Sequence, residues 1–181
     1  NMNGDSNGGS WSFTTQVTPD LNIKVFLEGP FNIGSEEMQT NLNPSGLPLS
    51  QPFIIAPWNY YGSETVTDVP QNTVDWILLE LRTNTSASSI VSRRAAFLRS
   101  DGVAIDLNGS NIISFPGVQD GSYYVVVYHR NHLAIMTENA IQLSETSSLY
   151  DFTTSQDKAY GNQAMKSLYG GKYGMYAADG N

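Results

Sequence analysis

The stretch VDWILLELR at Val74–Arg82 is apolar on both faces at its centre, as is typical of a strand inside a sheet. Two later stretches have the same character: Arg93–Leu107 reads RRAAFLRSDGVAIDL, and Gly121–Met136 reads GSYYVVVYHRNHLAIM. All three are rich in β-branched or aromatic residues, lack a helical period and contain or adjoin turns rich in Asp, Gly or Asn. They therefore predict long strands in a rigid β-scaffold.

Shorter segments extend this pattern along the chain. Asn22–Glu28 alternates apolar and polar residues as a half-buried strand does, and Asp101-Gly102 predicts a hairpin between two apolar strands. About nine strands with turns every ~8–12 residues favour an all-β fold, a two-sheet β-sandwich of Ig-like or jelly-roll-like type with long loops. Gly29–Ser50 is long, polar and rich in proline, so we expect no regular structure there.

The interior of this sandwich can be assigned to particular strands. We expect Val74–Arg82 and Tyr123–Arg130 to be interior strands because their centres are apolar. The expected core consists of apolar side chains from the predicted strands: Ile23, Val25, Leu27, Trp76, Leu78, Phe97, Leu98, Ile105, Val125 and Val127.

Composition indicates one domain. A chain of 181 residues with 40% hydrophobic residues can bury one core. We divide it into an N-terminal leader and exchange strand at 1–17, a β-sandwich domain at 18–155, and a Gly/Tyr-rich tail at 156–181 packed on the same domain. The net charge of −8 disfavours nucleic acid as a partner, and no apolar run approaches the ~20 residues of a membrane span. The start at Asn1 rather than Met suggests a segment of a longer precursor.

A series of motifs spans nearly the whole chain from Ile23. It comprises VFLEGPF (Val25–Phe31), PWNY (Pro57–Tyr60), VDWILLELR, RRAAFL (Arg93–Leu98), YYVVVYHRNHLAIM (Tyr123–Met136), YDFT (Tyr150–Thr153), AYG and AMK (both within Ala159–Lys166) and YGMYAADGN (Tyr173–Asn181). Together these resemble a β-sandwich module near the C-terminal ends of large secreted bacterial surface proteins, loosely labelled hemagglutinin-like or FG-GAP-like. The resemblance implies an extracellular, secreted protein at a bacterial surface, and it assigns no catalytic residues.

Both ends of the chain carry oxygen ligands of the kind that Ca²⁺ prefers. Proteins of the resembled class commonly continue into a D-x-N-x-D-G segment, but here Ala178 stands where Gly is usual. The candidate ligands are Asn3, Asp5, Asn7, Asp179 and Asn181. No Glu closes the N-terminal loop, and Asn in place of the first Asp lowers the expected affinity. The alternative is that both ends are flexible Asn/Gly linkers.

His129 and His132 in the sequence HRNH invite a Zn²⁺ interpretation, because two nearby imidazoles can bind this ion. Residues three apart on a continuous strand point to opposite faces, so the two rings converge only if the strand ends at Arg130. No third ligand is spaced to help. We therefore expect the histidines to end the strand and to form hydrogen bonds with neighbouring loops.

Catalytic patterns are weak in this sequence. Asp75 and Glu80 could serve as the carboxylate pair of a glycoside hydrolase, but their odd separation places them on opposite faces of one strand. There is no G-x-S-x-G elbow for a nucleophilic serine. One of Arg93 and Arg94 is expected to form an ion pair with Asp75 or Glu80. We predict that the chain is not an enzyme and has no cofactor other than the candidate calcium.

Three aromatic residues lie close together in the proline-bounded loop Pro57–Pro70: Trp58, Tyr60 and Tyr61. Exposed aromatic rings can stack on sugar faces, so this loop is a candidate glycan-binding site. The structural alternative is that Trp58 plugs one end of the sandwich and holds the loop down.

The N-terminal region has the layout of a strand that can leave its own domain. A polar leader precedes Trp11–Val17, where Trp11, Phe13, Thr15 and Val17 share one face. Such a segment can complete the open edge of a neighbouring sandwich, and this kind of contact propagates head to tail into a filament. The expected function is thus a non-enzymatic structural or adhesive module that polymerises with itself. The rival interpretations are a carbohydrate-binding module and, for Trp11–Val17, the first strand of its own sheet.

Overall fold

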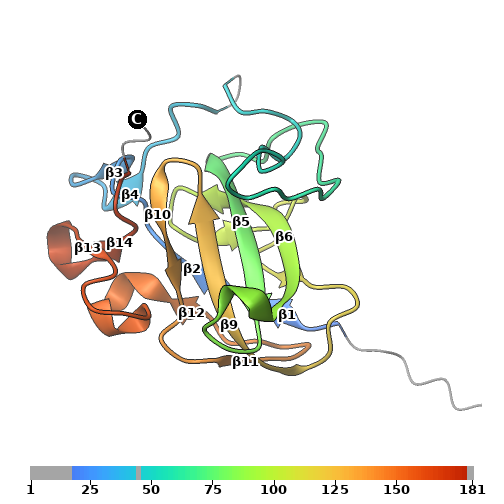
Figure 1. Ribbon diagram of the computed structural model, residues 1–181. Coiled ribbons are helices and arrows are strands. Elements are labelled where there is room, and N and C mark those ends of the chain that lie inside the picture. The colour runs from blue at the N-terminus through green and yellow to red at the C-terminus, as the bar shows by residue number, and fades with distance from the viewer. Residues whose placement is uncertain (1–17, 44–45, 179–181) are drawn as a thin grey trace, which may run out of the picture.

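The computed structural model describes residues 18–43 and 46–178. Within these ranges the chain forms strands and short 3-10 turns and contains no α-helix (Figure 1), which confirms the all-β prediction. The described residues include no helix with the length and apolar character that a membrane crossing requires.

The long strands form one antiparallel sheet in the order β10-β9-β5-β6-β7, with β11 paired to β9 as well. Their bounds are β5 Thr73–Arg82, β6 Ile90–Arg99, β7 Ala104–Ile105, β9 Gly121–His129, β10 His132–Met136 and β11 Ile141–Leu143. β5 lies between β6 and β9, and β9 lies between β5 and β10. Both strands expected to be interior are therefore interior.

Two-residue strands make up the remaining pairs. β1 (Asp20–Leu21) pairs with β8 (Ile113–Ser114), β2 (Ile23–Lys24) with β12 (Tyr150–Asp151), β3 (Phe31–Asn32) with β4 (Glu37–Met38), and β13 (Lys166–Ser167) with β14 (Tyr173–Gly174). The β2–β12 pair is parallel and the others are antiparallel. The 3-10 turns are η1 (Ala87–Ser89), η2 (Phe152–Thr154), η3 (Gln156–Lys158) and η4 (Tyr169–Gly171).

The β3–β4 hairpin corrects the expectation that Gly29–Ser50 has no regular structure. The Oδ1 atom of Asn32 accepts a hydrogen bond from the Gly34 N–H at 2.8 Å, and the Asn32 carbonyl accepts one from the Glu36 N–H at 2.9 Å. These bonds close a tight turn. Pro30 lies just outside the hairpin, so proline does not interrupt its ladder.

Successive side chains of β5 point to opposite faces of the sheet, and both faces are buried. Ile77, Leu79 and Leu81 pack into the larger core cluster, which also contains residues of β1, β2, β8 and η2. Trp76 and Leu78 point the other way, into a smaller cluster with Phe53. None of the ten side chains expected in the core is more than 1% exposed. The period of two thus places them correctly.

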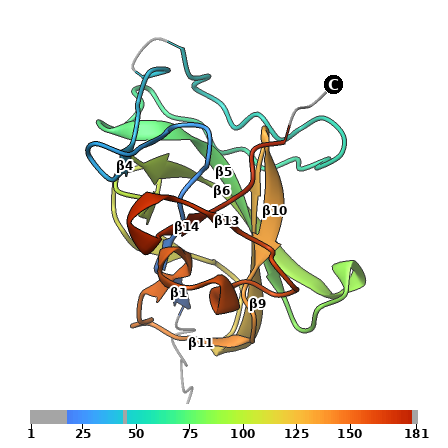
Figure 2. The same cartoon turned by 90° about the vertical axis from the view of Figure 1, so that its left-hand side faces the viewer.

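Different segments cover the two faces. Met165 and Met175, from the C-terminal part of the chain, are buried in the larger cluster, and Figure 2 shows β13 and β14 beside β10. The long connection from β4 to β5 covers the other face. It is attached there by Phe53 and by a 2.8 Å hydrogen bond from Trp76 Nε1 to the Pro48 carbonyl.

The described chain begins and ends at opposite ends of the long strands. Asp20 bridges Ser144, the residue after β11, and β11 pairs with the first residues of β9. Ala177 bridges His132, just beyond the last residue of β9. Nine residues of β9 therefore separate the two regions, about 30 Å of extended chain. In Figure 1, β1 likewise lies near the end of the sheet where β9 begins, away from the turn between β9 and β10.

Candidate binding pocket at the β9–β10 hairpin

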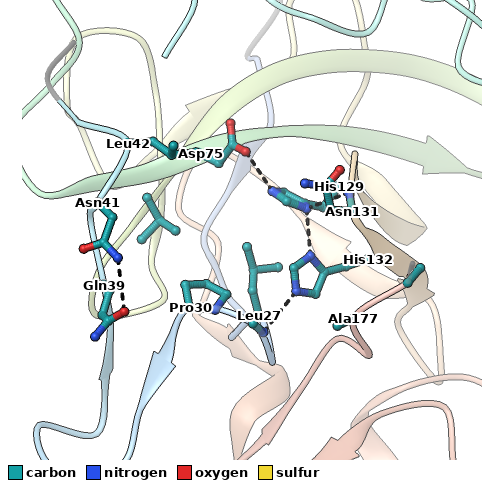
Figure 3. A pocket seen from close by; sticks show the side chains of 13 residues that line it. Leu27, Pro30, Gln39, Asn41, Leu42, Asp75, His129, Asn131, His132 and Ala177 are labelled. Carbon is teal, nitrogen blue, oxygen red and sulfur yellow. Dashed lines mark hydrogen bonds and ion pairs between the residues drawn. The ribbon is translucent and has the colours of Figure 1, made fainter. Parts of the chain in front are cut away.

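A pocket with a volume of about 380 Å³ opens at the end of the sheet where β9 turns into β10 (Figure 3). Segments far apart in the sequence form its walls. Four apolar residues line it: Leu27, Pro30, Leu42 and Val74. Three residues with amide side chains join them, Gln39, Asn41 and Asn131, together with a hydrogen-bonded series formed by Asp75, His129 and His132. The remaining lining residues are Gly29, Ala177 and Ala178.

The two histidines converge because β9 ends at His129. A two-residue turn, Arg130-Asn131, leads into β10, and His132 is the partner of His129 in the ladder. Residues directly opposite each other in a hairpin point to the same face. The Nδ1 atoms of the two rings lie 2.9 Å apart. The expected opposition of residues three apart applies to a continuous strand, and this strand ends before Arg130.

Backbone donors fix the tautomers of both rings. The Gly29 N–H donates to His132 Nε2 at 3.3 Å, so His132 carries its proton on Nδ1 and donates to His129 Nδ1. The Asn131 N–H also donates to His129 Nδ1, at 3.2 Å. His129 therefore carries its proton on Nε2 and donates to Asp75 Oδ2 at 3.1 Å.

Asp75 is the charged end of this chain and is only 4% exposed. A terminal nitrogen of Arg130 donates to both carboxylate oxygens, at 2.8 and 2.9 Å, and the Trp76 N–H donates to Oδ1 at 2.7 Å. Burial by itself raises the pKa of Asp75, but the hydrogen bond from His129 and the nearby positive charge of Arg130 outweigh it, so the pKa is lowered. The carboxylate is therefore ionised and compensated.

His132 is held in its neutral form. Burial, followed by the adjacent His129, lowers the pKa of His132 to about 4. All four ring nitrogens of the two histidines already take part in hydrogen bonds. Among the described residues, no group of three or more His, Cys, Asp or Glu side chains is arranged to hold a metal ion. The histidines thus end the strand and form hydrogen bonds with neighbouring segments, as the sequence HRNH predicted.

The second buried carboxylate lies on the other face of β5. Glu80 is 1% exposed and forms ion pairs with Arg82 at 2.6 Å and Arg93 at 2.7 Å. Tyr128 donates its hydroxyl to Glu80 at 3.2 Å. Asp75 and Glu80 thus face opposite sides of the sheet, and Arg93 pairs with Glu80, as the alternation predicted.

The three aromatic residues of the loop, Trp58, Tyr60 and Tyr61, differ in their contacts and exposure. The Trp58 ring packs edge-on against Phe53 at 5.4 Å, and the Trp58 carbonyl accepts a hydrogen bond from Arg93. Tyr60 donates its hydroxyl to Glu64. Tyr61 is 77% exposed. Of the three rings, Tyr61 alone is largely free to stack on a ligand.

Two other sets of candidate residues lie outside the described part of the chain. These are the assembly strand Trp11, Phe13, Thr15 and Val17, and the calcium ligands Asn3, Asp5, Asn7, Asp179 and Asn181.

The pocket brings in residues that sequence patterns do not single out. Gln39, Asn41 and Asn131 belong to no motif, and only the position of Asn131 in HRNH hints at its location. Among the described lining residues, apolar and amide side chains predominate, beside the hydrogen-bonded Asp75, His129 and His132.

Comparisons with family models, with curated proteins and with solved structures found no significant match to this chain.

Proposed function

We propose that the chain is a non-enzymatic structural or adhesive module of a bacterial extracellular surface, built on a β-sandwich. The five-strand order of the main sheet supplies one layer of such a sandwich. The short strands β1, β2, β8 and β12 would form the opposing layer, and their sharing of the larger core with the main sheet supports this proposal. A rigid scaffold of this type suits a protein that transmits load or presents a surface.

Head-to-tail assembly is the mode of action that we propose for this module. The observation that carries it is the position of β1 at one end of the long strands and of Ala177 at the other. A segment that precedes β1 and binds the next copy would extend the assembly along the strand direction. The contact would be heterologous, and such contacts form open filaments when the rotation between copies closes no ring.

The buried charges support a non-enzymatic role. Asp75 is neutralised by Arg130, and Glu80 is neutralised by Arg82 and Arg93. The pKa of Asp75 is lowered, whereas a general acid needs a raised pKa. The networks therefore serve the fold.

Removal of the N-terminal segment tests the assembly. The full chain should sediment as a concentration-dependent polymer and form filaments under electron microscopy, and a variant without residues 1–17 should remain a folded monomer. The double variant Trp11→Ala/Phe13→Ala should behave like the deletion. Its matched control Ser12→Ala/Thr14→Ala changes the opposite face and should still polymerise. A strictly monomeric full chain, or filaments from the truncated protein, would refute the proposal.

Carbohydrate binding is a second candidate function. The pocket at the β9–β10 hairpin favours it, because this pocket combines amide and apolar side chains at the exposed end of the sheet. Tyr61 in the aromatic loop offers a competing location for a glycan.

A further inference from the structure

We infer that the pocket at the β9–β10 hairpin is a binding site for a small neutral saccharide. This inference does not depend on filament assembly. The volume of about 380 Å³ lies within the roughly 300–1,000 Å³ of small-molecule sites. It can hold one or two sugar rings but not a folded partner.

The charge balance of the pocket selects a neutral ligand. Among the described lining residues Asp75 is the one carboxylate, and Arg130 compensates it at 2.8 Å. Burial lowers the pKa of the lining His132 to about 4, so this ring is neutral. Among the described lining residues, a cation would find no free carboxylate and an anion would find no cationic side chain. A charged ligand would lose its hydration without gaining a counter-charge from these residues, so a neutral ligand is favoured.

The amide side chains supply the polar recognition that a sugar needs. Asn41 donates to Gln39 Oε1 at 3.3 Å, so these two amides lie beside each other in the lining (Figure 3). The Gln39 amide nitrogen and the Asn41 side-chain oxygen make no hydrogen bond with the described residues. The side chain of Asn131 makes no hydrogen bond with the described residues. The Asn131 side chain presents a donor beside an acceptor, and the Gln39–Asn41 pair presents one of each. Adjacent sugar hydroxyls require this combination.

Apolar side chains complete the complementarity. Leu27 and Val74 are buried at the base of the pocket, and Leu42 is 50% exposed at its wall. Sugar rings carry C–H faces beside their hydroxyl groups, so they bind surfaces that mix apolar and amide groups. The chain of hydrogen bonds from Gly29 to Asp75 holds this surface in place before a ligand binds.

A glycan array followed by isothermal titration calorimetry tests the inference. The protein should bind one or more neutral glycans and show no preference for sialylated or sulfated ones. Leu42→Trp, which fills the pocket from its wall, and the double variant Gln39→Ala/Asn131→Ala should each weaken binding at least about tenfold. The control Leu49→Trp places the same ring at a side chain that is 49% exposed elsewhere, and it should bind normally.

Three results would overturn the inference: no neutral glycan bound, full binding by Leu42→Trp, or loss of binding in Tyr61→Ala. The last result would place the site on the aromatic loop. The variant without residues 1–17 should bind the same glycan, so a failure of assembly and a failure of glycan binding are separate outcomes. Circular dichroism of each variant checks that a loss of binding does not reflect unfolding.

Discussion

The Nδ1 atoms of His129 and His132 lie 2.9 Å apart, and a backbone N–H at Gly29 decides which of the two carries the proton. The chain of hydrogen bonds continues to Asp75, which is 54 residues from His129 in the sequence. One polar chain therefore links the segment after β2 to the start of β5 and to the β9–β10 hairpin. Its integrity depends on a neutral His132, and this dependence makes the module sensitive to acid.

Folding stability should fall between pH 6.5 and pH 4. The pKa of His132 is lowered from 6.5 to about 4 in the folded protein, so the unfolded chain binds the proton more readily in this window. The stability contributed by neutral His132 is present above pH 6.5 and is lost as the pH falls towards 4. Because the His132 ring is partly exposed to solvent, the free energy of unfolding should fall by about 1–3 kcal/mol. Urea denaturation at a series of pH values measures it.

The variant His132→Gln provides the control for this pH dependence. It should be less stable than the original chain at pH 7 and should show a flatter dependence between pH 6.5 and 4. Asp75 acts in a lower window, because its lowered pKa contributes stability above about pH 4 that is lost below it. An unchanged slope in His132→Gln would contradict the assignment.

Asp75→Asn should destabilise the protein by about 3 kcal/mol. The substitution leaves the Arg130 guanidinium without its counter-charge in a site where the carboxylate is only 4% exposed. Chemical denaturation at pH 7 measures the change. Asp101→Asn removes a more exposed partner of Arg99 and should cost less than about 1 kcal/mol. Equal effects of the two substitutions would show that burial does not govern the Asp75 pair.

Gly174→Ala should loosen the contact between the C-terminal segment and the core. A Cβ atom at this position would lie 2.8 Å from the Phe26 carbonyl oxygen, which is backbone and cannot rotate away. The expected cost is about 1–3 kcal/mol, with earlier proteolysis of residues 160–178. Gly34→Ala is the control, because its Cβ would meet only the Asn32 side chain at 3.3 Å. Equal stability of the two variants would argue against tight packing at Gly174.

Phe53→Ala should release the long connection between β4 and β5. Phe53 is fully buried against Trp76 and Phe97, and loss of an aromatic core side chain costs about 3–5 kcal/mol. Limited proteolysis should then cut within residues 49–69 before the sheet unfolds. Ile54→Ala, at a neighbouring side chain that is 54% exposed, should leave the protease pattern unchanged. Resistance of Phe53→Ala to cleavage would mean that other contacts hold the connection.

The long strands were accessible from sequence because their signal is local. The apolar centre of Val74–Arg82 predicted that Trp76 and Leu78 are buried, and its alternation placed Asp75 and Glu80 on opposite faces, as the structure has them. The β3–β4 hairpin was missed because the proline content of Gly29–Ser50 outweighed the turn signal at Asn32. That hairpin depends on the Asn32 side chain, whose hydrogen bonds no hydrophobic pattern reports.

The candidate pocket, in contrast, could not be predicted from the sequence. The sequence HRNH contains the histidines, but it determines neither the residue at which β9 ends nor the partner of each ring nitrogen. Strand pairing sets the end of β9, and packing of the segment after β2 brings the Gly29 N–H to His132. Gln39, Asn41 and Asn131 meet only because two connections converge at the same end of the sheet.

By itself, therefore, the sequence determined the all-β class, the interior strands and the core side chains, because the burial of alternating residues is a property of each strand. The tertiary structure alone decided which polar groups meet. Asp75 contacts Arg130 and His129 because of the register between β5 and β9 and the turn that follows β9. A shift of one residue in that register would move Asp75 away from its partners, and the compensated charge that defines the pocket would be lost.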